Sequence, residues 1–302
     1  MRIGIQFDTR SRGDLDALLA DFVRAEDEGF DTVWAGQVFD LDVLTLLALA
    51  GPRTRRIELG TSVVPLPTRH PTVLAQQALT AQLACGGRLC LGVGCGHAAI
   101  LGKKLGLEGD RPVARSREAL EVLRPLLRGE YVKHAGEFQR VRAGVPIAGA
   151  DAPPVLLAAL GPHMIGLAAE LADGVSLVFA GAGFVADRVR PLLPPGARIV
   201  ASLPVAVTEA VAGVSAEVDR FTAPSVALAA YQRVLAAQSA SRASEIGVIG
   251  DEAEVAEGLD ALAASGVTDL NPILVDSPAD PGCAGRTRAF LAGRARRGGA
   301  GT

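Results

Sequence analysis

The sequence predicts an α/β fold, a single (β/α)8 TIM barrel with insertions. Three observations lead to this prediction. The chain has 302 residues, and one α/β barrel takes about 250 residues. Short β-type runs alternate with helical patterns along the chain, which is typical of parallel βα units. Several of these runs are mostly apolar, without polar alternation, as strands are when both faces of a sheet are covered.

Eight segments have the character of barrel strands, and the first follows the initial methionine almost directly. Their expected boundaries are residues 3–7, 32–35, 57–64, 89–93, 155–158, 175–179, 199–207 and 270–275. In a (β/α)8 barrel the chemistry lies at the C-terminal ends of the strands. Functional residues are therefore expected just after each of these segments.

Helical patterns fill the gaps between the strands. Leu15, Leu18, Leu19, Phe22 and Val23 recur at steps of three and four residues and form one apolar stripe. This pattern predicts a helix over residues 14–28. The other expected helices cover residues 72–85, 115–127, 162–171, 184–193 and 252–264.

Local signals mark several helix ends. Asp251 and Glu254 have the spacing of a capping box at the start of the last of these helices. Pro162 directly follows Gly161 and suits the first helical position. Gly29 and Gly266 each stand between a helical pattern and a strand, as glycine does in a tight αβ loop.

Two segments interrupt the alternation. Residues 129–152 include a possible small hairpin over 131–138, and residues 209–244 have the pattern of an extra helical insertion. The predicted organisation is one barrel domain over 1–283, with a C-terminal helix and flexible tail over 284–302. The five arginines between 286 and 297 are interpreted as a solvated terminal helix rather than a basic patch.

Composition excludes several classes of function. The net charge of −3 and the pI of about 5.9 give no electrostatic case for binding nucleic acid or an anionic membrane. No apolar run is long enough to span a membrane, and the N-terminus lacks the apolar stretch of a signal peptide. We therefore expect a cytoplasmic protein. The four histidines lack the spacing of a metal pair, so no metal site is predicted.

Three motifs follow strand segments. They are LGTSVVPLPTRHP (59–71), GGRLCLGVGCGH (86–97) and PVLLAALGPHM (154–164). In the second, alternating glycines permit close approach of a flat ligand, and Cys95 and His97 are two residues apart. In the third, a strand turns through Gly161 directly into a helix, whose free N–H groups could bind a phosphate. Residue patterns alone leave a tight turn without a ligand as an equal alternative there.

Together these motifs resemble the bacterial-luciferase-like superfamily, and in particular its deazaflavin (coenzyme F420)-dependent oxidoreductases. The words that carry the resemblance occur in the family's order: GFDTVW (29–34), IELGTSV (57–63), RHP (69–71), GGR (86–88), LGVG (91–94), ALGP (159–162), ELADG (170–174) and GVTDL (266–270). The resemblance implies a barrel that binds F420 at its C-terminal face, with FMN as the alternative cofactor. Members of the family are often homodimers, so a homodimer is a further expectation.

The resemblance also assigns site residues. It implies a non-prolyl cis peptide at Ser62–Val63, which backs the tricyclic ring. It places Cys95 and Gly96 along the cofactor, and matches the turn from Leu160 to Met164 to the phosphate-binding segment. The full set of expected cofactor-binding residues is Gln37, Ser62, Val63, Cys95, Gly96, Leu160, Gly161, His163 and Met164, with Gly4 also near the ring.

The sequence departs from the family's sugar-phosphate dehydrogenases at their acid and base residues. Where these enzymes carry an Asp-His pair, this chain has Gln37 and Val38, and where they carry a glutamate it has His97. Since an imidazole titrates near pH 6.5, we predict His97 as the catalytic proton donor. The predicted activity is hydride transfer to a small enone, imine or carbonyl compound.

Three alternatives remain open on the sequence. One is an FMN-dependent monooxygenase on the same barrel. Another is a deazaflavin-binding protein without catalysis, since both known acid/base side chains are replaced. The third is an unrelated barrel hydrolase, for which Asp8, Asp40 and Asp276 are scattered candidates.

Overall fold

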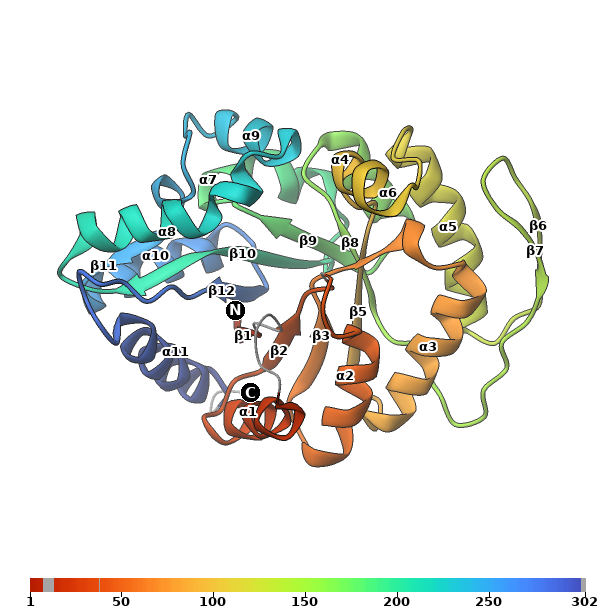
Figure 1. Cartoon of the computed structure of the whole chain (residues 1–302), viewed down its shortest axis with the longest axis horizontal. Helices are drawn as coiled ribbons and strands as arrows, with labels where there is room; N and C mark the ends of the chain where they lie inside the picture. The colour runs from red at the N-terminus through yellow and green to blue at the C-terminus, as the bar shows by residue number, and fades with distance from the viewer. Residues whose placement is uncertain (8–13, 38, 300–302) are drawn as a thin grey trace.

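A closed ring of parallel strands forms the centre of the molecule (Figure 1). The computed structural model describes residues 1–7, 14–37 and 39–299. Within these residues, eight strands close the barrel because β12 pairs with β1 on one side and with β10 on the other. The ring consists of β1 (Arg2–Phe7), β2 (Thr32–Ala35), β3 (Glu58–Thr61), β5 (Leu89–Gly94), β8 (Val155–Ala158), β9 (Gly174–Val178), β10 (Arg198–Val207) and β12 (Asp269–Ile273). The predicted TIM barrel is confirmed.

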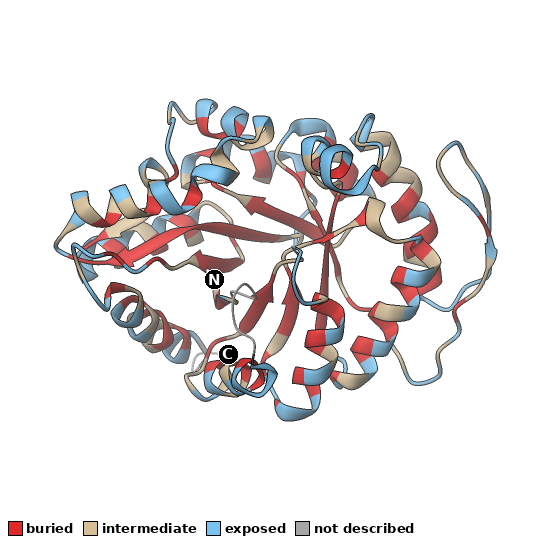
Figure 2. Ribbon diagram, in the orientation of Figure 1, coloured by how far each residue is buried: buried red, intermediate tan, exposed pale blue. Residues whose placement is uncertain are grey.

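Helices surround the ring and bury one side each against it. Figure 2 shows the strands buried almost throughout, while the helices alternate between buried and exposed residues. The main ones are α1 (Leu15–Asp27), α2 (Val43–Ala50), α3 (Pro71–Ala84), α5 (Pro112–Leu127), α6 (Pro162–Leu171), α10 (Glu252–Ala264) and α11 (Cys283–Gly299). The predicted capping box of α10 is present, with Asp251 and Glu254 each accepting a backbone N–H of the other.

Two predicted elements are wrong in detail. The expected strand 57–64 divides at residue 62 into β3 and the short β4 (Val64–Pro65), which pairs with β5. The expected helix 184–193 is instead α7 (Ala182–Phe184), a π-helical turn η4 (Val185–Val189) and a 3-10 turn η5 (Arg190–Leu192). Pro191 lies within this stretch, and a proline has no N–H to continue an α-helix.

Among the short elements that were not predicted, α2 and β11 each have a physical reason. Helix α2 is buried at five of its eight positions, which leaves too few polar residues to define a stripe. The three-residue β11 (Val248–Gly250) lies outside the ring and pairs with β10. Such a brief run is too short for periodicity to identify.

The two interruptions of the βα alternation form separate additions to the barrel. Strands β6 (Val132–Ala135) and β7 (Arg140–Ala143) make an antiparallel hairpin that projects from one side of the molecule (Figure 1). The Glu118 carboxylate on α5 holds its tip by accepting backbone N–H groups of residues 137–139, each at 2.9 Å. The second interruption contains α8 (Val211–Val226) and α9 (Ala229–Ala236), as the predicted helical insertion requires.

The C-terminal helix α11 packs on β1 and β10. Its residues Leu291 and Ala292 are buried. Its arginines make specific contacts: Arg288 donates to the Glu28 carboxylate at 2.6 Å and Arg286 to Asp280 at 2.5 Å. These charges are therefore engaged within the protein.

An ion cluster closes the N-terminal end of the barrel. Arg198 donates to the carboxylates of Glu58 at 2.9 Å and Asp269 at 2.6 Å, and Arg2 lies 3.3 Å from both. The next level along the axis is filled by Trp34, which is 1% exposed. This level requires glycine on the neighbouring strands, since a Cβ added at residue 60 would lie 2.3 Å from the indole. The lower half of the barrel is thus solid.

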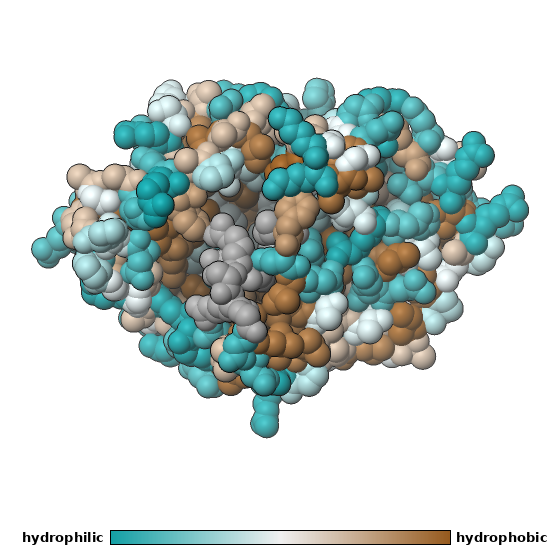
Figure 3. All heavy atoms as spheres, viewed as in Figure 1, coloured by the Kyte–Doolittle hydropathy of each residue, from teal (hydrophilic) through white to brown (hydrophobic). Residues whose placement is uncertain are grey.

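The outer surface is mixed in polarity. In the space-filling view, polar residues in teal cover much of the periphery and apolar residues in brown appear between them (Figure 3). Within the described ranges, no helix combines the length and the apolar character needed to cross a lipid bilayer.

Candidate functional site

The C-terminal end of the barrel is open above Trp34. Alternation along the strands directs Gln6, Ser62, Ala158 and Val178 toward the barrel axis. Gln6 is exposed and the other three are half-buried. Because side chains inside a closed barrel reach solvent only at an open end, these residues mark a site at the face where barrel enzymes carry their chemistry.

A non-prolyl cis peptide joins Ser62 and Val63, as predicted. The Ser62 N–H donates to the Ala35 carbonyl at 2.8 Å, and the Ser62 hydroxyl accepts from the Asn271 amide at 3.2 Å. Asn271 is fully buried and also donates to the Ser202 hydroxyl at 2.8 Å. Contacts from β2 and β12 therefore meet at Ser62, and β10 holds Asn271 in place through Ser202.

Glycines on β5 make room for the Val63 side chain. A Cβ added at Gly94 would lie 2.9 Å from Val63 Cγ2 and 3.1 Å from Ala158 Cβ, and one added at Gly92 would lie 3.1 Å from Val63 Cγ1. Real Cβ contacts are rarely this close, so a larger residue at position 94 would displace Val63, while one at position 92 would first meet the Thr61 carbonyl oxygen at 2.0 Å. The alternating glycines noticed in the sequence thus shape the wall of the site.

The loop after β5 carries Cys95, Gly96 and His97. Gly96 has a φ of 71°, a conformation that favours glycine. His97 Nε2 lies 3.2 Å from the hydroxyl of Tyr231 on α9, and the two rings meet edge to face at 5.0 Å. Burial lowers the pKa of His97, raises that of Cys95 and raises that of Tyr231 to about 12. All three groups are therefore neutral near pH 7, and the thiol is no activated nucleophile.

Tyr231 is a site residue that sequence reasoning missed. It lies in the helical insertion, more than a hundred residues from His97, and no motif surrounds it. The available signal was its rarity, since the chain has 2 tyrosines, but rarity does not place a residue in space. Its ring also contacts Phe179 edge to face at 5.4 Å.

The predicted phosphate segment opens α6. Gly161 is its N-cap residue, no side chain caps the helix, and a Cβ added at Gly161 would meet nothing within 4 Å. Gly161 and His163 are exposed and Leu160 is half-buried. Met164 is buried, and its N–H donates to the Gly161 carbonyl at 3.1 Å. The backbone N–H groups at the start of α6 are therefore the main groups that the turn presents to a ligand. The helix dipole favours an anion at this end of the helix.

Two further predicted residues have local partners. The Gln37 side-chain oxygen accepts the Val43 N–H at 3.0 Å and thus helps to cap α2. Gly4 packs beneath Trp34, with an added Cβ 2.6 Å from the indole nitrogen, so it lies below the open level. Asp8 and Val38 lie outside the described residues.

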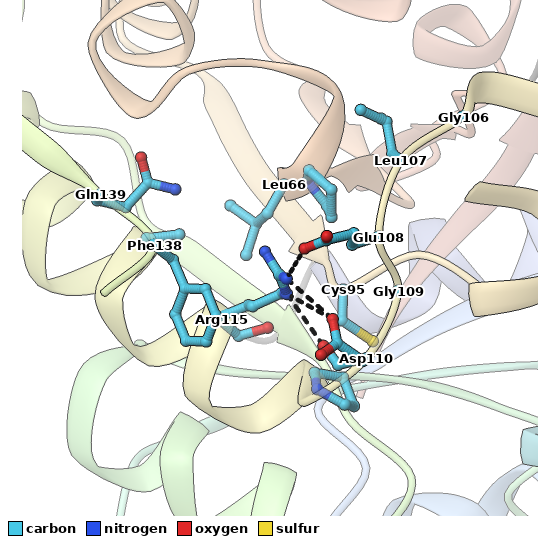
Figure 4. Close-up of a pocket in the computed structure, with 14 residues that line it drawn as sticks. Leu66, Cys95, Gly106, Leu107, Glu108, Gly109, Asp110, Arg115, Phe138 and Gln139 are labelled. Carbon is cyan, nitrogen blue, oxygen red and sulfur yellow. Dashed lines mark hydrogen bonds and ion pairs between the residues drawn. The ribbon is translucent and has the colours of Figure 1, made fainter. Parts of the chain in front are cut away.

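A cavity of about 410 Å³ extends from Cys95 toward α5 and the hairpin tip (Figure 4). Arg115 crosses it, lying 4.3 Å over the Phe138 ring and 2.9 Å from Asp110. The Ser116 hydroxyl on its wall is buried and has no hydrogen-bond partner among the residues that the structure describes. The lining residues are Leu66, Pro67, Cys95, Gly106, Leu107, Glu108, Gly109, Asp110, Pro112, Arg115, Ser116, Ala119, Phe138 and Gln139.

This arrangement fits a flat ligand with an anionic tail. The inward side chains of the upper barrel are partly accessible to solvent, the glycines on β5 leave room for the Val63 side chain, and the uncapped start of α6 offers backbone N–H groups. In the part of the chain that the structure describes, no three histidine, cysteine or acidic side chains gather as metal ligands.

Comparison with known proteins supports this interpretation. A family model described as luciferase-like monooxygenase matches residues 1–269. The chain is 37% identical over 170 residues to a putative coenzyme F420-dependent oxidoreductase of Mycobacterium tuberculosis, covering 51% of this chain and 49% of the relative. It is 34% identical over 152 residues to a 5,10-methylenetetrahydromethanopterin reductase of Archaeoglobus fulgidus, covering 50% and 46%. The matches thus span about half the length of these curated relatives.

A solved structure shares the fold over nearly the whole chain. It is an F420-dependent secondary alcohol dehydrogenase in complex with an F420-acetone adduct, with a TM-score of 0.76 at 18% identity. The match covers 96% of this chain and 97% of that chain. At this identity the likeness establishes the architecture alone.

Proposed function

The chain belongs to the luciferase-like monooxygenase family, and we propose that it is a coenzyme F420-dependent oxidoreductase acting on a small organic substrate. The observation that carries the proposal is the wall that the Val63 side chain forms at the C-terminal end of the barrel, where Gly94 leaves room for it. The F420-dependent relatives named above support the choice of cofactor.

The residues present have distinct roles toward such a cofactor. Ser62 and Val63 would back the ring from one side, and Cys95 and Gly96 would line its edge. The first turn of α6 would hold the phosphate through backbone N–H groups. When bound, the deazaflavin gives or takes a hydride, and the protein contributes orientation and exclusion of water.

His97 is the group that we propose moves the proton. In the direction of reduction, a C=O or C=N bond opens, its carbon gains the hydride with its electron pair, and its oxygen or nitrogen takes a proton from the His97 imidazolium. The neutral imidazole remains. Because burial lowers the pKa of His97, the imidazolium is the minor form near pH 7 and gives up its proton readily, while the neutral ring that predominates serves as base in the opposite direction.

The surroundings of His97 favour an uncharged substrate. Phe179 and Tyr231 present aromatic rings, and Val178 faces the barrel axis. Arg69, near the mouth, is paired with Asp42. The hydrogen bonds and ion pairs of His97, Phe179 and Tyr231 involve no lysine or arginine in the described segments. We therefore propose an enone, imine or carbonyl compound of low polarity rather than a sugar phosphate.

Cofactor binding is the first test. The full chain is titrated with oxidised F420 and, separately, with FMN, and binding is followed by fluorescence. We expect tight binding of F420 and much weaker binding of FMN. Preference for FMN would instead indicate a flavin monooxygenase, and binding of neither would overturn the proposal.

Turnover is the second test. Oxidation of reduced F420 is followed by absorbance with a panel of enones, imines and ketones. We expect turnover with at least one class. Tight F420 binding with no turnover across the panel would favour a binding protein without catalysis.

A further inference from the structure

We propose that Tyr231 is the positioning residue for His97. Its hydroxyl occupies Nε2 of the imidazole in a hydrogen bond, and Nδ1 is therefore the nitrogen that exchanges the proton with the substrate. This inference rests on the proposed function of His97. It adds a residue from the helical insertion to the site and identifies the reacting atom.

The contact between the two side chains is specific. His97 Nε2 lies 3.2 Å from the Tyr231 oxygen, and the rings meet at an interplanar angle of 62°. Among the described residues, no other group hydrogen-bonds to the His97 ring. One imidazole nitrogen is thus held and the other is left for a ligand.

The direction of this hydrogen bond follows from the chemistry. A hydroxyl can donate or accept, whereas each imidazole nitrogen donates only when it carries hydrogen. If Nε2–H donates to the Tyr231 oxygen, the bond persists in both the neutral ring and the imidazolium. If the hydroxyl donated to a bare Nε2, the bond would have to reverse whenever the imidazolium formed. During turnover the imidazole alternates between its neutral and charged forms. Only a bond donated by Nε2–H holds the ring in both forms.

Tyr231 is itself held firmly. Its ring packs against Phe179, which directly follows β9. Gln238, from the same insertion, donates to the Phe179 carbonyl at 2.8 Å and accepts the Gly181 N–H at 2.8 Å. The insertion is therefore bound to the loop after β9, and the Tyr231 hydroxyl has a defined position at the mouth.

The test compares Tyr231→Phe with the wild-type chain and with Tyr131→Phe. Phenylalanine keeps the ring contacts and removes the hydroxyl, while Tyr131 is 65% exposed and serves as the matched control. The pKa of His97 is measured by NMR in the cofactor-free protein. Its signal is assigned by its absence in His97→Gln, and the signals of the other three histidines serve as internal references.

A hydrogen bond from Nε2–H is stronger when the ring is charged. Loss of the acceptor hydroxyl should therefore weaken the proton affinity of His97 by at least about threefold. The control should leave the affinity unchanged. An unchanged or increased affinity in Tyr231→Phe would overturn the proposal, because it would mean that the hydroxyl makes no bond or donates it. Cys95 is the other titratable group near the pair, and it is intact in every variant.

A second measurement separates this inference from the proposed function. In the F420-loaded protein, Tyr231→Phe should lower kcat by about tenfold and leave KM and the F420 affinity nearly unchanged. A fall in F420 affinity with unchanged kcat would count against a positioning role. If the wild-type chain binds no F420, the proposed function fails, while the pKa comparison still decides how Tyr231 and His97 are bonded.

Discussion

Replacement of Arg198 by methionine tests the ion cluster at the base of the barrel. Methionine keeps an apolar stem over Trp34 and removes the guanidinium that bonds Glu58 and Asp269. The Asp269 side chain is 2% exposed, so its charge would remain buried with one cation fewer. Removal of one partner from a buried pair costs about 3–5 kcal/mol.

The lower end of that range applies here. Asp269 keeps Arg2 at 3.3 Å and the Thr268 hydroxyl at 2.7 Å. We therefore expect the free energy of unfolding to fall by about 3 kcal/mol, which corresponds to a decrease in Tm of roughly 6–12 °C. The measurement is urea and thermal denaturation followed by circular dichroism.

Arg294→Met is the matched control, because Arg294 pairs with Asp260, whose side chain is 68% exposed. An exposed pair of this kind contributes less than about 1 kcal/mol. The double variant Arg198→Met with Asp269→Asn should recover part of the lost stability, since it also removes the buried carboxylate that has lost one of its two arginine partners. If Arg198→Met were as stable as the control, the assignment of a buried, mutually dependent cluster would be refuted.

Four further predictions concern the open end of the barrel and the cavity beside it. His97→Gln should lower turnover at least about a hundredfold while F420 affinity stays within about twofold in a fluorescence titration; comparable losses in both would mean that His97 serves binding instead. Because burial lowers the pKa of His97 in the folded state, the unfolded chain binds this proton more readily. The free energy of unfolding of the wild type should therefore decline as pH falls below about 6.5, and more steeply than that of His97→Gln. Parallel denaturation profiles for the two proteins would contradict this. The alkaline absorbance titration of Tyr231→Phe is subtracted from that of the wild type, and the difference reports the ionisation of Tyr231. We expect its midpoint near pH 12. A midpoint near 10 would show that Tyr231 is open to water. Ser116→Ala should keep or increase stability by about 1 kcal/mol in urea denaturation, because the buried hydroxyl has no partner; a clear loss would point to a bound water that the hydroxyl holds.

The sequence predicted most of the barrel because its signals are local. Strand segments such as 155–158 and the capping box at Asp251 depend on nearby residues, and both are found where expected. The Ser62–Val63 peptide was predicted through its family motif. The predicted helix over 184–193 failed because Pro191 interrupts α-helical hydrogen bonding within it.

The contacts that complete the site are long-range, and this is why the sequence did not reveal them. Tyr231 meets His97 only because the helical insertion folds back over the loop after β5. Asn271 likewise reaches Ser62 across the barrel from the last strand of the ring. Neither pairing has a periodicity or a motif, so a single sequence contains no signal for it. The predicted roles of Leu160, His163 and Met164 in binding phosphate stay predictions.

The solid lower half of the barrel has a consequence for kinetics. The ion cluster and Trp34 close one end of the barrel. Two ligands that bind inside it must therefore both enter and leave through the C-terminal end. The ligand that lies deeper must then arrive first and depart last. Steady-state measurements should accordingly reveal a compulsory order, in which the deeper ligand binds first and leaves last.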